Sequence, residues 1–245
     1  MLGLDIFERF GLDFLARWAH VLVGITWIGL LYYFNFVQVP SFAQMEAGAR
    51  NNAIDKLASR ALWWFRWAAA ATVLFGVFLL VHQQGREIWD SDYIKSAEGI
   101  SILTGVLLGL TMFLNVWIVI WPNQKKVIAN ARNVQAGGQA DPAAAEAGRR
   151  SALASRQNTI FSFPMLFFMV GTAHFFGGYD TSDNRAIYWI VTVVIWAVLE
   201  LNCLGILGGR TQNLTNWIYE DHRRAIAAGL VLVVVWYALW EIVFG

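Results

Sequence analysis

Two histidines lie inside apolar stretches of the chain, and the first lies within residues 13–38. That stretch is long enough for a membrane-spanning helix, which needs about 20 residues. An ionisable side chain in lipid is costly, so His20 marks either a functional site or a packed contact between helices. Gly24 and Trp27 follow His20 on one helical face, and Arg17 lies one turn before it. This pattern suits a haem, with an axial ligand, room for the ring and a partner for a propionate.

His174 repeats the pattern in a second apolar stretch, residues 159–177. Gly171 lies on the same helical side, one turn deeper than His174. Histidine is a common iron ligand, and two histidines at matched depth predict a haem held edge-on between two helices. We therefore expect His20 and His174 to bind the haem iron. The alternative is close helix packing at small residues, with each histidine bonded to a neighbouring backbone.

The other two histidines lie at the ends of apolar stretches. His82 ends the stretch 61–82, and an interfacial position is expected there. It is also a candidate alternative ligand, or a propionate partner together with Arg86. His222 lies in the charged sequence EDHRR and is expected to be solvated.

The composition is that of a membrane protein. Of the 245 residues, 58% are hydrophobic and only 14% charged, with a mean hydropathy of +0.49, whereas soluble domains carry about 25% charged residues. The net charge of +1 gives no reason to expect nucleic acid as a partner. Cys203 is the only cysteine, so the chain has no CxxCH site for a covalent haem, and the expected group is haem b. We predict an all-α, polytopic helix bundle integral to a lipid bilayer.

The apolar stretches predict about six transmembrane helices in a single domain, residues 1–245. Residues 1–12 are expected to form an interfacial helix, and residues 123–158 a cytoplasmic helical segment between spans three and four. Within that segment, Asp141 is an expected N-cap, followed by Pro142 at the first helical position. The six spans are expected at about 13–38, 61–82, 98–121, 159–177, 185–207 and 224–243.

The basic residues predict the orientation of the spans. Twelve lysines and arginines fall in one set of loops and five in the opposite set. The richer set faces the cytoplasm by the positive-inside rule, which predicts periplasmic N- and C-termini in a bacterial inner membrane. The basic side chains of segment 123–158 are expected to anchor it to the inner leaflet rather than to bind a partner: Lys125, Lys126, Arg149, Arg150 and Arg156.

A second polar set lies deeper, towards the predicted cytoplasmic side. Glu200 is its most demanding member, because a carboxylate inside a span needs a partner or a proton. Arg66, in the same half of its span, is the nearest expected partner. We expect a structural contact between Arg66 and Glu200, with a proton path as the alternative. The other members are Asn35, Gln38, Asn115, Thr159, Ser162 and Asn202.

Three stretches resemble the urate oxidase N-terminal-domain family, the membrane part of a bacterial urate hydroxylase. They are RWAHVLVGITWIGLLYYF at 17–34, NVWIVIWPNQKKVI at 115–128 and SRQNTIFSFPMLFFMVGTAHF at 155–175. The first also resembles small haem-linked membrane proteins of the protoporphyrinogen-oxidase type. His20 and His174 match the family's histidine positions. The other matching residues are Asn115, Trp117, Trp121, Pro122, Asn123, Gln124 and Lys125 in span three, and Ser155, Arg156, Asn158, Thr159 and Pro164 in span four.

The resemblance implies an oxidoreductase that oxidises urate, or another small reductant, and passes electrons to a c-type cytochrome. No cytochrome c domain follows Gly245, so a separate periplasmic cytochrome is expected. The alternative is a non-catalytic accessory or scaffold subunit of a larger respiratory or photosynthetic membrane complex. A transporter is the third possibility and ranks last, because the two halves show no corresponding pair of broken helices.

Overall fold

The computed structural model describes residues 6, 8–82 and 87–245, and within these ranges every regular element is a helix. Five helices in the described ranges are long and apolar enough to cross a membrane. The prediction of an all-α membrane helix bundle is therefore confirmed. The five helices are Arg9–Gln44, Ala47–His82, Ala97–Gln135, α9 (Arg185–Cys203) and α10 (His222–Phe244).

The first and third of these helices contain a wider, π-helical turn just before a proline. Pro40 follows the π-helical segment Tyr33–Gln38, and Pro122 follows the segment Asn115–Ile120. Proline has no N–H and its ring crowds the preceding turn, so a wider turn lets the helix continue. The expected spans one and three end just before these prolines, at residues 38 and 121, and in both places the helix continues beyond the proline. The parts are α1 (Arg9–Tyr32) with α2 (Val39–Gln44), and α6 (Ala97–Leu114) with α7 (Trp121–Gln135).

The expected fourth span is the second half of α8 (Pro142–His174), a helix of 33 residues. It is not among the five candidates, because its apolar part from Thr159 to His174 is shorter than the ~20 residues of a full span. Packing against α6, α7 and α10 covers it. Asp141 accepts a hydrogen bond from the Ala143 N–H, which confirms the predicted N-cap.

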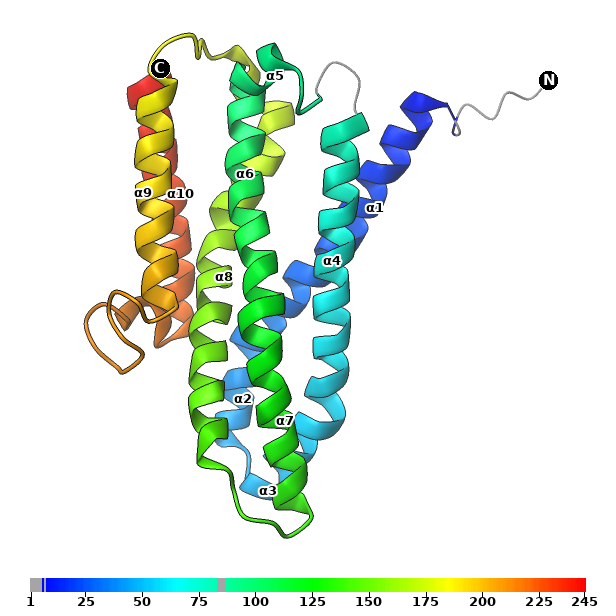
Figure 1. The fold of residues 1–245 in the computed structure, drawn as a ribbon, viewed down its shortest axis with the longest axis vertical. Coiled ribbons are helices and arrows are strands. Elements are labelled where there is room, and N and C mark those ends of the chain that lie inside the picture. Colours follow the sequence, from blue (N-terminus) through cyan, green and yellow to red (C-terminus); the bar gives the residue numbers. More distant parts are fainter. Residues whose placement is uncertain (1–5, 7, 83–86) are drawn as a thin grey trace, which may run out of the picture.

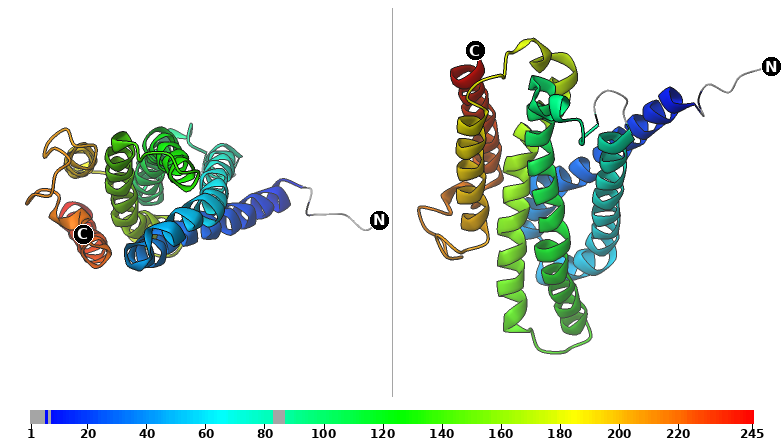
Figure 2. Two further views of the ribbon diagram at one scale, coloured as in Figure 1. Left: turned by 90° about the horizontal axis from the view of Figure 1, so that it is seen from below. Right: turned by 45° about the horizontal axis from the view of Figure 1, so that its top comes forward.

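The bundle has two sides joined by a central layer (Figures 1 and 2). α1 packs mainly against α4 on one side, α9 and α10 form the other side, and α6, α7 and α8 lie between them. The start of α1 and the end of α10 lie at the same end of the bundle (Figure 1), which we call the outer end. The remaining helices are α3 (Ala47–Ala53), continued by the π-helical segment Ile54–Ala58 into α4 (Ser59–His82), and the short α5 (Ser91–Lys95).

The ends of the helices differ from the expected spans in three places. Residues 9–12 belong to the first turns of α1, and residues 1–5 and 7 of the expected interfacial helix 1–12 lie outside the described residues. α8 ends at His174, and a 3-10 turn, Phe176–Gly178, follows it. α9 ends at Cys203, four residues before the expected boundary. The side of the membrane that each end faces stays a prediction.

Candidate functional site

His20 lies between α1 and α4, bonded to the α4 backbone. Its Nδ1 is 2.8 Å from the carbonyl oxygen of Thr72. A carbonyl only accepts, so Nδ1 carries the proton and Nε2 keeps its lone pair. Gly76, one turn along α4, lets the ring approach: a Cβ there would lie 3.0 Å from His20 Cε1. The imidazole is therefore oriented through one nitrogen, and the other is available to a ligand.

The neighbours of His20 on α1 differ in their surroundings. Gly24 faces α4 at ordinary packing distance, because an added Cβ would lie 3.9 Å from Thr72 Cγ2. Trp27 is buried in the core, and its indole N–H has no hydrogen-bond partner among the described residues. Arg17 is exposed, one turn nearer to the outer end. The exposed Arg17 agrees with the expected pattern, whereas Gly24 packs against α4 and Trp27 belongs to the packed interior.

His82 lies at the outer end of α4 and is also held through Nδ1. The partner is a carboxylate oxygen of Asp13, 2.7 Å away, and the ring stacks on Phe78 with 4.7 Å between centroids. Arg9 also binds the end of α4, because it donates to the His82 carbonyl oxygen and to the Glu87 carboxylate, each at 2.8 Å. A carboxylate bonded to a histidine is an arrangement that orients ligand imidazoles. Arg86, the expected companion of His82, lies outside the described residues.

His174 is exposed at the end of α8. No hydrogen bond, ion pair or ring contact joins it to His20 or His82 in the part of the chain that the structure describes. Gly171 beneath it is not next to open space, because an added Cβ would lie 2.6 Å from Phe176 Cε2. The Phe176 ring is buried against Phe168 and Trp240. The structure therefore places His20 and His82 on the same pair of helices and leaves His174 on a separate one.

His222 is only partly exposed, although its charged sequence suggested full solvation. It is the first residue of α10, with Nδ1 3.8 Å from an Asp221 carboxylate oxygen and its ring near Phe36. It begins α10, at the end of that helix that points away from the outer end of the bundle (Figure 1).

The deep polar set forms a closed network between α6, α8 and α9. The Asn115 amide donates to Asn158 Oδ1 at 3.0 Å and to Glu200 Oε2 at 3.2 Å. Asn158 in turn donates to the Met112 carbonyl oxygen at 2.9 Å. All three side chains are buried. Asn115 begins a π-helical segment of the α6–α7 helix, and such turns re-aim side chains.

The expected contact between Arg66 and Glu200 is wrong. Arg66 stacks its guanidinium over the Trp121 ring, with 3.8 Å from Cζ to the centroid, and its Nη1 is buried without a hydrogen bond. α4 and α9 lie on opposite sides of the bundle (Figure 2), so the two side chains are separated by the central layer. The expectation rested on a shared depth in the membrane, and depth does not reveal which helices are neighbours.

The rest of the deep set ties helices together. The Asn35 amide donates to Ser155 Oγ at 2.8 Å, and Tyr32 and Ser162 share a hydrogen bond of 2.9 Å. Both pairs join α1 and its continuation to α8. The Thr159 hydroxyl bonds within α8 to the Ser155 carbonyl oxygen, Asn202 donates to the Thr215 carbonyl oxygen, and Gln38 Oε1 is buried without a partner.

Sequence analysis missed the groups that hold the histidines, which are Thr72, Gly76, Asp13 and Phe78. The available signal was the small pair Thr72 and Gly76, four residues apart and so on one helical face in span two. Small residues in membrane helices mark close approach of another helix. This pair of small residues does not indicate which helix packs against span two.

Comparison with known proteins identifies the family. The family model described as urate oxidase N-terminal matches residues 86–238, more than half of the chain. The chain belongs to this family. The matched range holds the stretches at 115–128 and 155–175, and it begins after His20 and His82. No curated protein and no solved structure matches the chain.

Proposed function

We propose that the chain is a membrane oxidoreductase subunit of the urate hydroxylase type that binds haem b through His20. The carrying observation is the hydrogen bond from Nδ1 of His20 to the Thr72 carbonyl oxygen. It leaves Nε2 unprotonated, in the form that binds iron, and it fixes the plane of the ring as second-shell bonds do for metal-bound histidines.

The residues around His20 fit a haem better than a metal ion bound by protein side chains alone. Among the described residues no group of three or more His, Cys, Asp or Glu side chains could hold a metal. A haem needs only one or two protein ligands, because the macrocycle supplies the other four. Gly24 presents only a small surface next to His20 on α1, and the exposed Arg17 is a partner for a propionate.

His82 and His174 are the two candidate second ligands, and the sequence pattern favours His174. His82 is on the helix that already holds His20, and Asp13 presents it with Nε2 free. His174 would need to be approached from the α8 end, where Phe176 fills the space beside Gly171. The spectra of single variants separate the two choices.

A bound haem would supply one-electron chemistry. The chain's own residues would hold it through His20, neutralise a propionate at Arg17 and shield the ring with the apolar faces of α1 and α4. His20 lies about 17 Å from the start of α1, at 1.5 Å per residue, so an acceptor at the outer end would be near. We propose a separate c-type cytochrome as that acceptor, urate or another small reductant as donor, and a bacterial inner membrane as the location.

The alternative function is a non-catalytic subunit of a larger membrane complex. It is favoured by large apolar side chains exposed on the outer halves of α1 and α4. Trp18 is 57% exposed and Leu74 is 66% exposed. A partner subunit could cover these side chains in place of lipid. A subunit of this kind would carry no haem of its own.

The test is a reduced-minus-oxidised visible spectrum of protein purified from its native membrane. We expect a b-type signal that His20→Ala abolishes, whereas His222→Ala, the matched histidine control at the inner end, leaves it unchanged. Loss in His82→Ala but not in His174→Ala would assign the second ligand to α4, and the reverse result would assign it to α8. A flat spectrum from folded native protein would overturn the haem proposal and favour the accessory subunit.

A further inference from the structure

An apolar groove opens near the inner end of α10, on the opposite side of the bundle from His20 and His82 (Figure 2). Its volume is about 580 Å³, within the ~300–1,000 Å³ typical of ligand sites. Side chains of α8, α9, α10 and the preceding loop line it, among them Leu199, Ala227, Val231 and Val235. Because α9 and α10 are candidate membrane helices, the groove faces the lipid rather than water. It suits a hydrocarbon chain.

Two arginines lie at the inner end of this groove, and among the described residues they are the only charged ones that line it. Arg223 and Arg224 are both exposed, and in the part of the chain that the structure describes neither guanidinium forms an ion pair. The nearby Glu220 is taken by Arg149, which binds it through two nitrogens. Asp221 caps α10 by accepting from the Arg223 N–H at 2.8 Å. The rim therefore offers two free positive charges to an anion.

Trp217 fixes the position of this rim. The Arg224 guanidinium lies over its ring, 4.8 Å from the centroid. A polar cavity of about 470 Å³ adjoins the groove there, since Trp217 and Arg224 line both, and its other walls are formed by Gln212, Asn213, Glu220 and Asp221. Along α10, the apolar groove is thus followed by the two guanidinium groups and then by the polar cavity.

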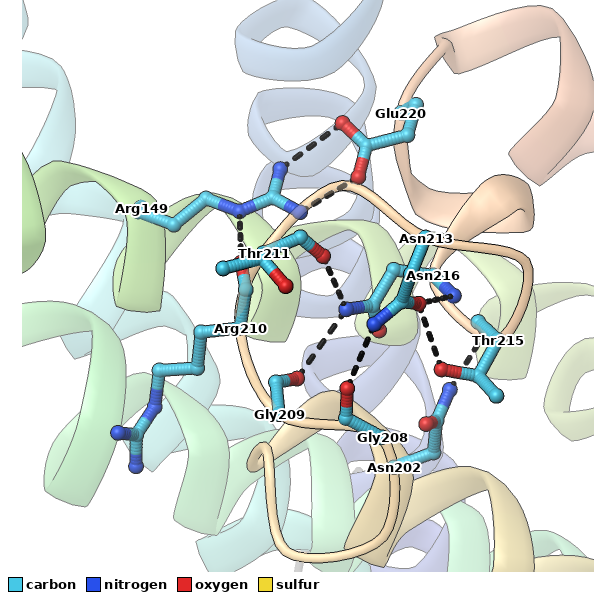
Figure 3. A network of polar contacts seen from close by, with 10 residues as sticks. All are labelled: Arg149, Asn202, Gly208, Gly209, Arg210, Thr211, Asn213, Thr215, Asn216 and Glu220. Atoms are coloured by element: carbon cyan, nitrogen blue, oxygen red, sulfur yellow. Dashed lines mark hydrogen bonds and ion pairs between the residues drawn. The ribbon is translucent and has the colours of Figure 1, made fainter.

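A set of hydrogen bonds holds the loop that precedes Trp217 in place (Figure 3). The buried Asn216 amide donates to the carbonyl oxygens of Gly209 and Thr211 at 3.1 and 2.7 Å. Gly209 has a φ of +69°, a backbone conformation that favours glycine. Arg149 binds both ends of the loop. It donates to the Arg210 carbonyl oxygen at 2.7 Å and to the Glu220 carboxylate at 2.9 Å. The rim is therefore organised before any ligand arrives.

We propose that this groove binds one anionic phospholipid. The phosphodiester pairs with Arg223 and Arg224, one acyl chain lies along Ala227, Val231 and Val235, and a hydroxylated head group enters the polar cavity beside Asn213. Arginine pairs bind phosphate oxygens through charge-assisted hydrogen bonds, and basic pockets between membrane helices recognise anionic head groups.

Native mass spectrometry of the full chain tests the proposal, with equimolar phosphatidylglycerol and phosphatidylcholine added to protein in mild detergent. We expect phosphatidylglycerol to be retained in preference. The double variant Arg223→Gln, Arg224→Gln should weaken its retention about tenfold or more, since one charge-assisted bond accounts for about a factor of ten. The double variant Lys125→Gln, Lys126→Gln removes the same charge from the same end and should retain the lipid.

A groove-filling variant keeps the proposal testable if loss of the arginines disturbs folding. Ala227→Trp leaves both charges in place but fills the apolar groove from an exposed position. It should also lose phosphatidylglycerol. Equal retention of the two lipids, equal loss in the two charge variants, or full retention by Ala227→Trp would overturn the proposal.

Discussion

The two polar regions of this bundle use their hydrogen-bonding capacity in opposite ways. In the deep network, Asn115, Asn158 and Glu200 bond to one another and to backbone between three packed helices. At the outer end, His20 and His82 each use one ring nitrogen on a protein acceptor and keep the other free. A polar group that is fully paired inside a membrane stabilises the fold, whereas one that is half paired is prepared for a ligand. Stability should therefore depend on the first region and cofactor binding on the second.

The largest effect on stability is expected in the deep network. Asn115→Leu leaves Glu200 and Asn158 buried without their shared donor, and each orphaned buried group costs about 1–3 kcal/mol. We expect a loss of about 3 kcal/mol in the free energy of unfolding, measured in detergent with a denaturant. His20→Ala, which removes one hydrogen bond at the outer end, should cost about 1 kcal/mol. Equal losses in the two variants would contradict the comparison.

The next effect concerns cofactor affinity at the outer end. Asp13→Asn removes the carboxylate that orients His82, and loss of such second-shell partners lowers metal affinity about 10–100-fold. We expect haem titration of the purified variant to show a reduction in that range if His82 is the second ligand. Asp55→Asn provides a control carboxylate, at an ion pair with Arg132 and Lys56 far from the histidines. Unchanged affinity in Asp13→Asn would exclude His82 as the second ligand.

A smaller effect on stability is expected from substitutions at two glycines near His20. An added Cβ at Gly76 would lie 3.0 Å from His20 Cε1, whereas at Gly24 the nearest atom would be 3.9 Å away. Gly76→Ala should cost about 1 kcal/mol through overpacking, and Gly24→Ala should stay within about 0.5 kcal/mol of the native protein. Thermal unfolding of both variants in the same detergent measures the difference. A larger loss of stability in Gly24→Ala than in Gly76→Ala would contradict the packing of α1 against α4 described above.

The smallest effect tests the position of Arg66. A double-mutant cycle between Arg66→Ala and Trp121→Leu should give a coupling energy of about 1 kcal/mol, as for a cation–π pair. The cycle between Arg66→Ala and Glu200→Gln should give coupling near zero, because no described contact joins the two residues. Stronger coupling in the second cycle would restore the ion pair that the sequence suggested.

Much of the fold followed from the sequence, and less of the site. The helix positions and the Asp141 cap were predictable, since apolar length and capping residues are local properties. Helix neighbours were not, because membrane helices are apolar on all sides and show no face directed at the interior. For that reason Arg66 was assigned to Glu200 instead of Trp121. The folding of Phe176 back onto Gly171 was also missed, because it depends on a turn after the helix.

The central claim is that the free nitrogen of His20 binds iron, and an imidazole rescue experiment tests it most directly. His20→Gly removes the ring and leaves a space between α1 and α4 that exogenous imidazole can enter. We expect the b-type spectrum to be lost in this variant and to return when imidazole is added, with no such response in His222→Gly. A variant that keeps its spectrum without imidazole, or native protein with no haem signal, would contradict the account.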